Sequence, residues 1–106
     1  RFGTAIIRNG IEISASTRSL VKAVHEGQVA FADTFTDFGN LVILDHGGQS
    51  YSLYGYLSSL AVERGTRVDD QTILGTVGRA PAGTSALYFE LRIDGEPVDP
   101  VEWLQE

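Results

Sequence analysis

The sequence predicts a single all-β domain made of short antiparallel strands. Its 106 residues suit one domain with a core of its own. Twelve glycines are spread along the chain, and runs rich in β-branched and aromatic residues lie between them. No segment keeps the apolar period of an amphipathic helix over several turns. Short strands separated by frequent turns are typical of a β-sandwich or a barrel.

These patterns place seven strands along the chain. In order, the strands are expected at residues 11–15, 20–24, 27–33, 41–46, 49–56, 72–77 and 86–93. A single helical turn is expected at residues 58–62. A second is expected at residues 100–104, because Pro100 suits the first position of a helix.

The last of these strands carries an unusual residue. In the segment SALYFELR, residues 85–92, apolar side chains alternate with small or polar ones. A period of two predicts a half-buried strand with an apolar face and a polar face. The polar face then carries Tyr88 together with Glu90 and Arg92, and the role of this tyrosine depends on what else shares the face.

Composition narrows the possible partners. A net charge of −6 disfavours non-specific nucleic-acid binding, because phosphate binding needs clustered Lys and Arg. No apolar run reaches about 18 residues, so we expect no membrane insertion by this domain. The absence of cysteine excludes disulfides and thiolate metal sites. The chain contains no methionine, and we expect residues 1–106 to be the C-terminal part of a longer protein.

Two local patterns resemble the halves of a barrel-sandwich hybrid fold. One runs over residues 21–27 and the other over residues 64–75, and each joins a strand to a further strand through a glycine turn. Lipoyl carriers use this fold and present a lysine at a hairpin tip. Here Lys22 is the only lysine and lies inside an expected strand, so a surface lysine is the simpler interpretation.

The whole chain resembles the LytM (lysostaphin-like) zinc metallopeptidase domain, which cuts peptide crosslinks in peptidoglycan. The resemblance rests on segments that match in order: RNGIEI (8–13), VKAVHEGQVAFAD (21–33), FGNLVILDHG (38–47), YSLYGYLS (51–58), GTRVDDQTILGTVG (65–78), SALYFELR (85–92) and VDPVEWL (98–104). It implies an all-β, LytM-like barrel-sandwich hybrid with an antiparallel sheet.

The resemblance also locates the positions of a zinc site. In the peptidases, His-x-Gly-x-Asp and the second His of His-x-His hold the metal, and two further histidines assist. The three ligand positions correspond here to Arg8, Glu12 and Tyr88, and the two helper positions to Tyr56 and Ala86. Arginine has no lone pair to offer, and alanine cannot bind a metal. The remaining histidines, His25 and His46, lie outside the motif. We therefore expect no metal, no cofactor and no peptidase activity.

The replacements resemble the EnvC type of degenerate LytM domain. Such domains bind and activate periplasmic, zinc-dependent N-acetylmuramoyl-L-alanine amidases during daughter-cell separation, which implies a location at the cell wall, in the periplasm or otherwise outside the cytoplasm. On this interpretation a groove binds the protein partner. Its expected residues are Asn9, Glu12, Phe38, Leu41, Tyr54, Tyr56, Tyr88 and Arg92.

Other interpretations stay open. The tyrosines can simply fill the space that zinc and its histidines leave. A second function is a peptidoglycan-binding or structural module that does not activate an enzyme, and a third is a zinc endopeptidase with rearranged ligands, which the missing histidines disfavour. Glu12 keeps an acid where the activators tend to have none.

Overall fold

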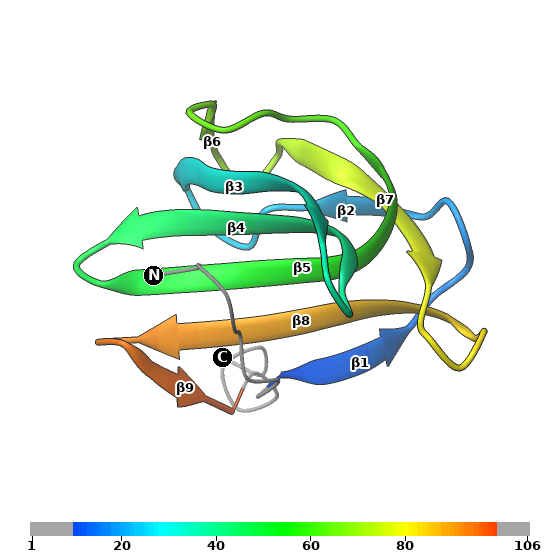
Figure 1. Ribbon diagram of the computed structural model, residues 1–106. Coiled ribbons are helices and arrows are strands. Elements are labelled where there is room, and N and C mark those ends of the chain that lie inside the picture. Colours follow the sequence, from blue (N-terminus) through cyan, green and yellow to red (C-terminus); the bar gives the residue numbers. More distant parts are fainter. Residues whose placement is uncertain (1–9, 100–106) are drawn as a thin grey trace.

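Nine strands form one antiparallel sheet within residues 10–99, the part of the chain that the computed structural model describes (Figure 1). They are β1 (Ile11–Ser14), β2 (Leu20–Lys22), β3 (Gly27–Phe35), β4 (Gly39–Gly47), β5 (Ser50–Leu60), β6 (Arg67–Val68), β7 (Ile73–Arg79), β8 (Ser85–Ile93) and β9 (Glu96–Val98). The expected all-β, antiparallel architecture is confirmed.

The sheet curls because β5 changes its partner midway. The order is β1-β8-β7-β5-β4-β3-β6, with β2 beside β7 and β9 beside β8. Residues 51–55 of β5 pair with β8, whereas residues 57–60 pair with β7. Figure 1 shows β4, β5 and β8 side by side, and β1 and β9 along the outer edge of β8. The divergence of β7 from β8 folds the sheet over an enclosed core.

The two faces of the sheet carry two apolar clusters. The inner core contains Val21, Ala23, Val29, Val42, Leu44, Tyr54, Leu57, Val68, Leu74, Val77, Phe89 and Leu91. The outer cluster contains Phe38, Leu41, Ile43, Leu53, Tyr56, Ala80, Ala86 and Tyr88. Strand β4 supplies both, because successive side chains of a strand point to opposite faces. Each fully buried aliphatic side chain contributes roughly 1.5–3 kcal/mol through apolar burial.

The structure corrects several local expectations. The helical turn expected at residues 58–62 is wrong, because β5 continues to Leu60. Pairing with β7 prevails over local preference there: the hydroxyls of Ser58 and Ser59 lie 2.7 and 2.6 Å from Thr76 Oγ1. Strands β6 and β9 are not anticipated, because two or three residues are too few to show a period. The turn expected at residues 100–104 lies outside the described residues.

The half-buried pattern expected for β8 is also wrong. Tyr88 and Glu90, on the polar face, are exposed by only 2% and 0%. Both faces of this strand are covered because it lies between the inner core and the outer cluster. The polar face of β8 is therefore a buried polar site.

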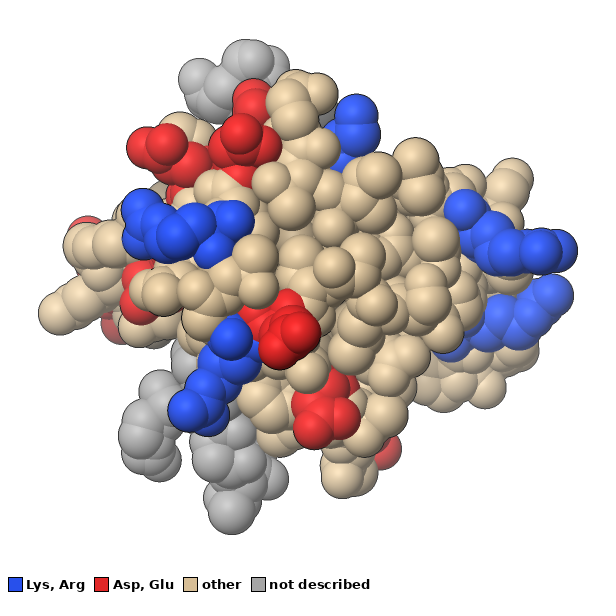
Figure 2. All heavy atoms as spheres, turned by 90° about the horizontal axis from the view of Figure 1, so that it is seen from above, with Lys and Arg blue, Asp and Glu red and all other residues tan. Residues whose placement is uncertain are grey.

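Charge is distributed without a large field of one sign. Acidic and basic side chains are interspersed on the side of the molecule drawn in Figure 2, with a broad uncharged area between them. Residues 10–99 contain no helix long and apolar enough to cross a membrane.

Candidate functional site

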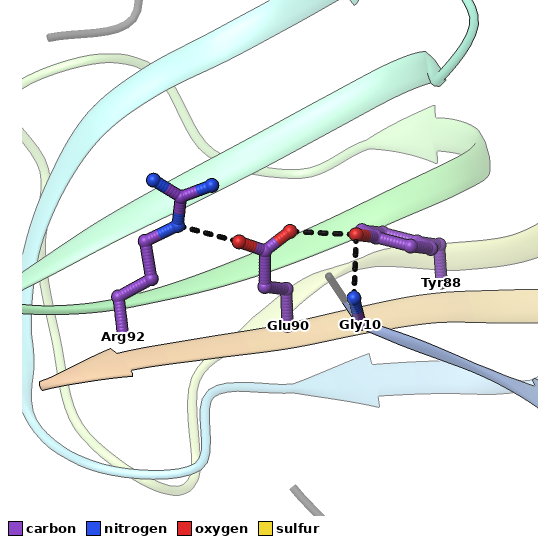
Figure 3. Close-up of polar contacts among 4 residues, drawn as sticks. All are labelled: Gly10, Tyr88, Glu90 and Arg92. Atoms are coloured by element: carbon purple, nitrogen blue, oxygen red, sulfur yellow. Dashed lines mark hydrogen bonds and ion pairs between the residues drawn. The ribbon is translucent and has the colours of Figure 1, made fainter. Parts of the chain in front are cut away.

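Three polar side chains of β8 line up on the face that carries the outer cluster (Figure 3). The backbone N–H of Gly10 donates to the Tyr88 hydroxyl oxygen at 2.9 Å. The Tyr88 hydroxyl donates to Glu90 Oε1 at 2.6 Å, and Arg92 Nε donates to Glu90 Oε2 at 2.5 Å. Residues two apart in a strand point to the same side. The Glu90 carboxylate thus joins a phenol and a guanidinium into one unit.

The side chains of this unit are buried to different degrees. Glu90 is fully buried, whereas 28% of the Arg92 side chain is exposed. A buried carboxylate is costly unless its charge is paired and its oxygens accept hydrogen bonds. Here both oxygens accept one, and one of the two donors is a cation. Glu90 therefore fixes Arg92 at the floor of the face while the Arg92 side chain still reaches solvent.

A β-bulge in β5 aims Tyr56 at the same face. Residues 40 and 42 of β4 pair with residues 57 and 54 of β5, which leaves Gly55 and Tyr56 opposite the single residue Leu41. Tyr56 has a φ of 64°, a left-handed conformation that costs a bulky residue roughly 1–2 kcal/mol. Bulges redirect side chains and are frequent beside functional sites. Tyr56 consequently lies in the outer cluster, although Tyr54, two residues earlier, does not.

The redirected tyrosine completes an aromatic floor. The Tyr56 hydroxyl donates to Glu12 Oε2 at 3.2 Å, which ties β5 to β1. The ring of Tyr88 lies 5.9 Å from that of Tyr56 and 5.0 Å from that of Phe38, centroid to centroid. A Cβ at Gly55 would lie 3.3 Å from both Phe38 and Tyr88. The absence of a side chain at Gly55 leaves room for this ring packing.

Tyr54 is separate from the other two tyrosines, which corrects the expectation that all three line one groove. It lies in the inner core and is 1% exposed. Its hydroxyl accepts from Ser52 Oγ at 2.8 Å and from the Val24 N–H at 3.1 Å. Burial raises the pKa of Tyr54 to about 12, although these two hydrogen bonds lower it. The bulge after Tyr54 is the physical cause of the separation.

The hydrogen bonds of His46 also lie away from the aromatic floor. His46 Nε2 is 2.7 Å from Ser52 Oγ, and its Nδ1 donates to the Glu26 carbonyl at 2.8 Å. His25 is exposed, with its ring centroid 6.0 Å from that of His46. Both ring nitrogens of His46 are engaged within the fold, so the network holds β4 and β5 together.

The other expected groove residues divide into floor and rim. Phe38, Leu41 and Ala86 belong to the outer cluster and are buried at 1%, 0% and 3% exposure. Glu12 is exposed, on the neighbouring strand β1. Arg8 and Asn9 lie outside the described residues. Of the expected groove residues within 10–99, Glu12 and Arg92 are the two whose side chains reach the surface.

Two groups of this site were not among the groove residues expected from the sequence. One is the Glu90 carboxylate and the other is the Gly10 backbone N–H. The position of Glu90, two residues beyond Tyr88 in the same strand, is the signal that could have identified it. A backbone donor such as that of Gly10 has no sequence signal, because every residue except proline carries one.

Within residues 10–99, the side chains that the resemblance assigns to the zinc and helper positions do not fit a zinc ion. The phenols of Tyr88 and Tyr56 bond to the carboxylates of Glu90 and Glu12. Zinc sites use thiolate, imidazole and carboxylate ligands with tetrahedral geometry. Within residues 10–99, no group of three or more His, Cys, Asp or Glu residues is arranged to hold a metal. The arrangement is suited to holding an arginine and an aromatic floor in fixed positions.

Comparison with known proteins identifies the family of this chain. The model of peptidase family M23 matches residues 7–100. The murein hydrolase activator EnvC of Escherichia coli is 38% identical over 96 residues, which cover 90% of this chain and 23% of EnvC. Outer membrane antigenic lipoprotein B of Haemophilus influenzae is 32% identical over 96 residues, covering 90% of this chain and 24% of that protein. The chain thus spans about a quarter of the length of these two relatives.

Solved structures share the fold. The catalytic domain of the antimicrobial peptidase lysostaphin from Staphylococcus simulans aligns with a TM-score of 0.83, over 92% of this chain and 78% of that one, at 22% identity. At this identity the likeness concerns the fold alone. The family model spans nearly the whole sequence, and its match agrees with the curled antiparallel sheet. The chain belongs to peptidase family M23, the family of LytM domains.

Proposed function

We propose that this domain binds and activates a zinc-dependent N-acetylmuramoyl-L-alanine amidase and does not itself hydrolyse peptidoglycan. The observation that carries the proposal is the network of Gly10, Tyr88, Glu90 and Arg92. At the position that the resemblance assigns to the third zinc ligand, Tyr88 is bonded to other groups of the chain, whereas a catalytic zinc site keeps an open coordination position. The similarity to a murein hydrolase activator supports the same proposal.

The network favours binding because it prepares a contact residue in advance. Arginine is frequent among residues that dominate binding energy, because its planar donors bond while its stem packs. Glu90 holds Arg92 on the face that carries Tyr88, with Glu90 between the two along β8. A side chain held in this way loses less conformational entropy when a partner binds. The partner then contacts Arg92, which Glu90 holds, and Glu12, which the Tyr56 hydroxyl holds.

Activation follows if the partner's active form binds this face more tightly than its inactive form. We propose that the face captures an autoinhibitory helix of the amidase and so uncovers the amidase's own zinc. The amidase population then shifts toward the open state, and the shift cannot exceed the difference in affinity between the two states. Uncovering the zinc requires no catalytic group on this domain.

The cellular setting that we propose is the periplasm, where the domain acts in cell-wall remodelling and daughter-cell separation. The names of two relatives support this setting, since one is a murein hydrolase activator and the other an outer membrane antigenic lipoprotein.

The test is release of dye from labelled peptidoglycan by the domain alone, by an amidase of the same organism alone, and by the two mixed. We expect release above the amidase background only in the mixture. Release by the domain alone would contradict the absence of catalysis. If the mixture gives no more than the amidase background while the domain binds purified peptidoglycan directly, the domain is a wall-binding module and not an activator.

A further inference from the structure

A hollow lies on the inner face of the sheet, away from the network of Tyr88. It has a volume of about 260 Å³, and its lining is mainly apolar, with Ile13 of β1, Leu20 of β2, Val24 just beyond β2 and Leu87 of β8. Ile13 and Leu87 are directly paired, so both point to the same face. Successive residues of a strand alternate between faces, so this face is opposite to that of Tyr88. We call this hollow the β2 cavity.

The apolar lining of the β2 cavity is open to solvent. Ile13 and Leu87 are only half-buried. Leu20 and Val24 are 60% and 37% exposed. Within the described part of the chain, one more large hydrophobic side chain is exposed, that of Ile73, which pairs with β2. Apolar side chains exposed one at a time are normal, whereas a contiguous exposed group marks a binding surface. The exposed apolar surface of this domain is gathered around β2.

The surroundings of the β2 cavity are basic, although the chain as a whole is acidic. Residues 13–25 and 71–89 contain Arg18, Lys22 and Arg79 and no acidic residue, whereas the net charge of the chain is −6. Pairing of β1 with β8 and of β2 with β7 brings these two segments together. Figure 2 shows basic and no acidic side chains at its right-hand end, where the turns after β1 and β7 lie in Figure 1. The charge around the cavity is therefore positive.

Two of these cations lie beside the cavity. Lys22 is one of its lining residues. The backbone N–H of Arg18 donates at 2.9 Å to the carbonyl of Val77, another lining residue. Both basic side chains are exposed, and neither forms an ion pair within residues 10–99. An anion at the edge of the cavity can therefore meet two cations.

Two polar groups that line the cavity are already hydrogen-bonded. The Tyr54 hydroxyl accepts from Ser52 Oγ and from the Val24 N–H. The Ser19 carbonyl accepts from the Val77 N–H at 2.9 Å. A peptide backbone laid against these groups would lose hydrogen bonds to water without gaining them here, which is costly. An acyl chain has no hydrogen-bonding groups, so it buries apolar surface without this cost.

We propose that the β2 cavity binds the acyl chain of an anionic amphiphile, whose carboxylate or phosphate head lies beside Lys22 and Arg18. The chain covers the exposed parts of Ile13, Leu20 and Leu87. Ligand pockets typically combine an apolar lining with a few polar groups that fix the orientation of the ligand. A free fatty acid and an anionic membrane lipid share this chemistry. The inference goes beyond the proposed function and does not depend on it, because the two sites lie on opposite faces of β8.

A series of chain lengths tests the apolar part of the proposal on the wild-type 106-residue chain. Hexanoate, octanoate and decanoate are titrated by calorimetry, each below the concentration at which it forms micelles. We expect affinity to rise about fourfold for each added methylene until the cavity is full. At low salt, a decyl ammonium cation should bind about fivefold more weakly than decanoate. Equal affinity for the three carboxylates, or for the cation and decanoate, would overturn the inference.

Two pairs of matched variants locate the site. Leu20→Ser should lower the affinity for decanoate about fivefold, whereas Ile73→Ser, at an exposed apolar residue outside the lining, should stay within about twofold. Lys22→Gln should lower it about threefold at low salt, whereas Arg64→Gln, on an exposed turn, should leave it unchanged. Thermal melting confirms that each variant is folded. Equal losses within either pair would overturn the assignment to the β2 cavity.

Flotation with lipid vesicles distinguishes the two sources of the ligand. Binding to phosphatidylglycerol vesicles, but not to phosphatidylcholine vesicles, would identify a membrane lipid if Leu20→Ser and Lys22→Gln weaken it. Binding of decanoate without binding to vesicles would identify a free amphiphile. Binding of neither would overturn the inference and leave the cavity to an apolar segment of a protein. Amidase activation by the Leu20→Ser variant, measured in parallel, tests the proposed function separately.

Discussion

Two tyrosines two residues apart in β5 illustrate the difference between the faces of this sheet. Tyr54 and Tyr56 are almost equally buried, at 1% and 3% exposure. The Tyr54 hydroxyl bonds to a serine hydroxyl and to a backbone N–H, which are both neutral groups. The Tyr56 hydroxyl bonds to an exposed carboxylate on the outer face. Burial does not distinguish the two roles, but the charge and exposure of the bonded partner do.

Tyr88 extends the comparison to the centre of the site. It is as buried as Tyr54, yet its partner Glu90 also holds a partly exposed arginine. The inner network continues through Ser52 to His46 and ends at the backbone carbonyl of Glu26, whereas the outer network ends at the Arg92 side chain, which is 28% exposed. We therefore propose a structural role for the first network and a binding role for the second.

The largest stability effect is expected at Tyr54. Tyr54→Ala removes a ring from the inner core and leaves the Val24 N–H without its acceptor, so the free energy of unfolding should fall by about 4 kcal/mol. Urea denaturation followed by circular dichroism measures this. A loss below about 1.5 kcal/mol would contradict the assignment of Tyr54 to the core.

The same residue should make stability depend on alkaline pH. An unfolded tyrosine loses its proton near pH 10, whereas burial raises the pKa of Tyr54 to about 12. Between these values the folded state binds more protons than the unfolded state, so rising pH favours unfolding. The contribution is fully present below pH 10 and is lost toward pH 12, and it amounts to about 2–3 kcal/mol.

Tyr54→Phe provides the control, because it keeps the ring and removes the titrating group. The difference in unfolding free energy between the two proteins should change between pH 10 and 12. A constant difference over that range would show that Tyr54 does not titrate as its burial requires.

On the outer face, Glu90→Gln should lower the free energy of unfolding by about 2 kcal/mol. The amide can accept from only one of its two donors, and Arg92 loses its counter-charge. The exposure of Arg92 limits the cost, because its side chain can turn to water. Glu63→Gln, on an exposed loop, is the matched control and should change stability by less than about 0.5 kcal/mol. Equal effects of the two substitutions would argue against a buried network.

The smallest effect is expected for Tyr56→Phe. It removes only the hydrogen bond to Glu12, which is exposed and can bond to water instead. We expect a loss of about 1 kcal/mol or less in urea denaturation. A loss as large as that of Tyr54→Ala would place Tyr56 among the structural residues. It would contradict the assignment of different roles to the two faces of the sheet.

The sequence could predict the fold class because strand signals and glycine turns recur along the whole chain. The seven expected strands match observed ones, and the predicted LytM resemblance is confirmed by the M23 match. Periodicity could not show that the polar face of β8 is buried. The covering comes from the outer cluster, whose members Phe38, Leu41 and Leu53 are distant in sequence.

The site could be predicted only in part, since Tyr88 and Arg92 share the expected face. The separation of Tyr54 from Tyr56 could not be predicted, because the bulge places a tyrosine and not a glycine or asparagine at positive φ. Local sequence therefore gave no sign that Tyr54 and Tyr56 belong to different clusters.

The most direct test of the central claim is amidase activation measured with Arg92→Ala and Arg79→Ala. Both arginines reach the surface, but Arg79 lies at the end of β7 and donates to the Gly83 carbonyl. Thermal melting should first establish that both variants are folded at the assay temperature. We expect Arg92→Ala to lower activation about tenfold or more and Arg79→Ala to leave it within about twofold. Activation by a folded Arg92→Ala variant at the wild-type level would show that Arg92 is not a contact residue for the amidase.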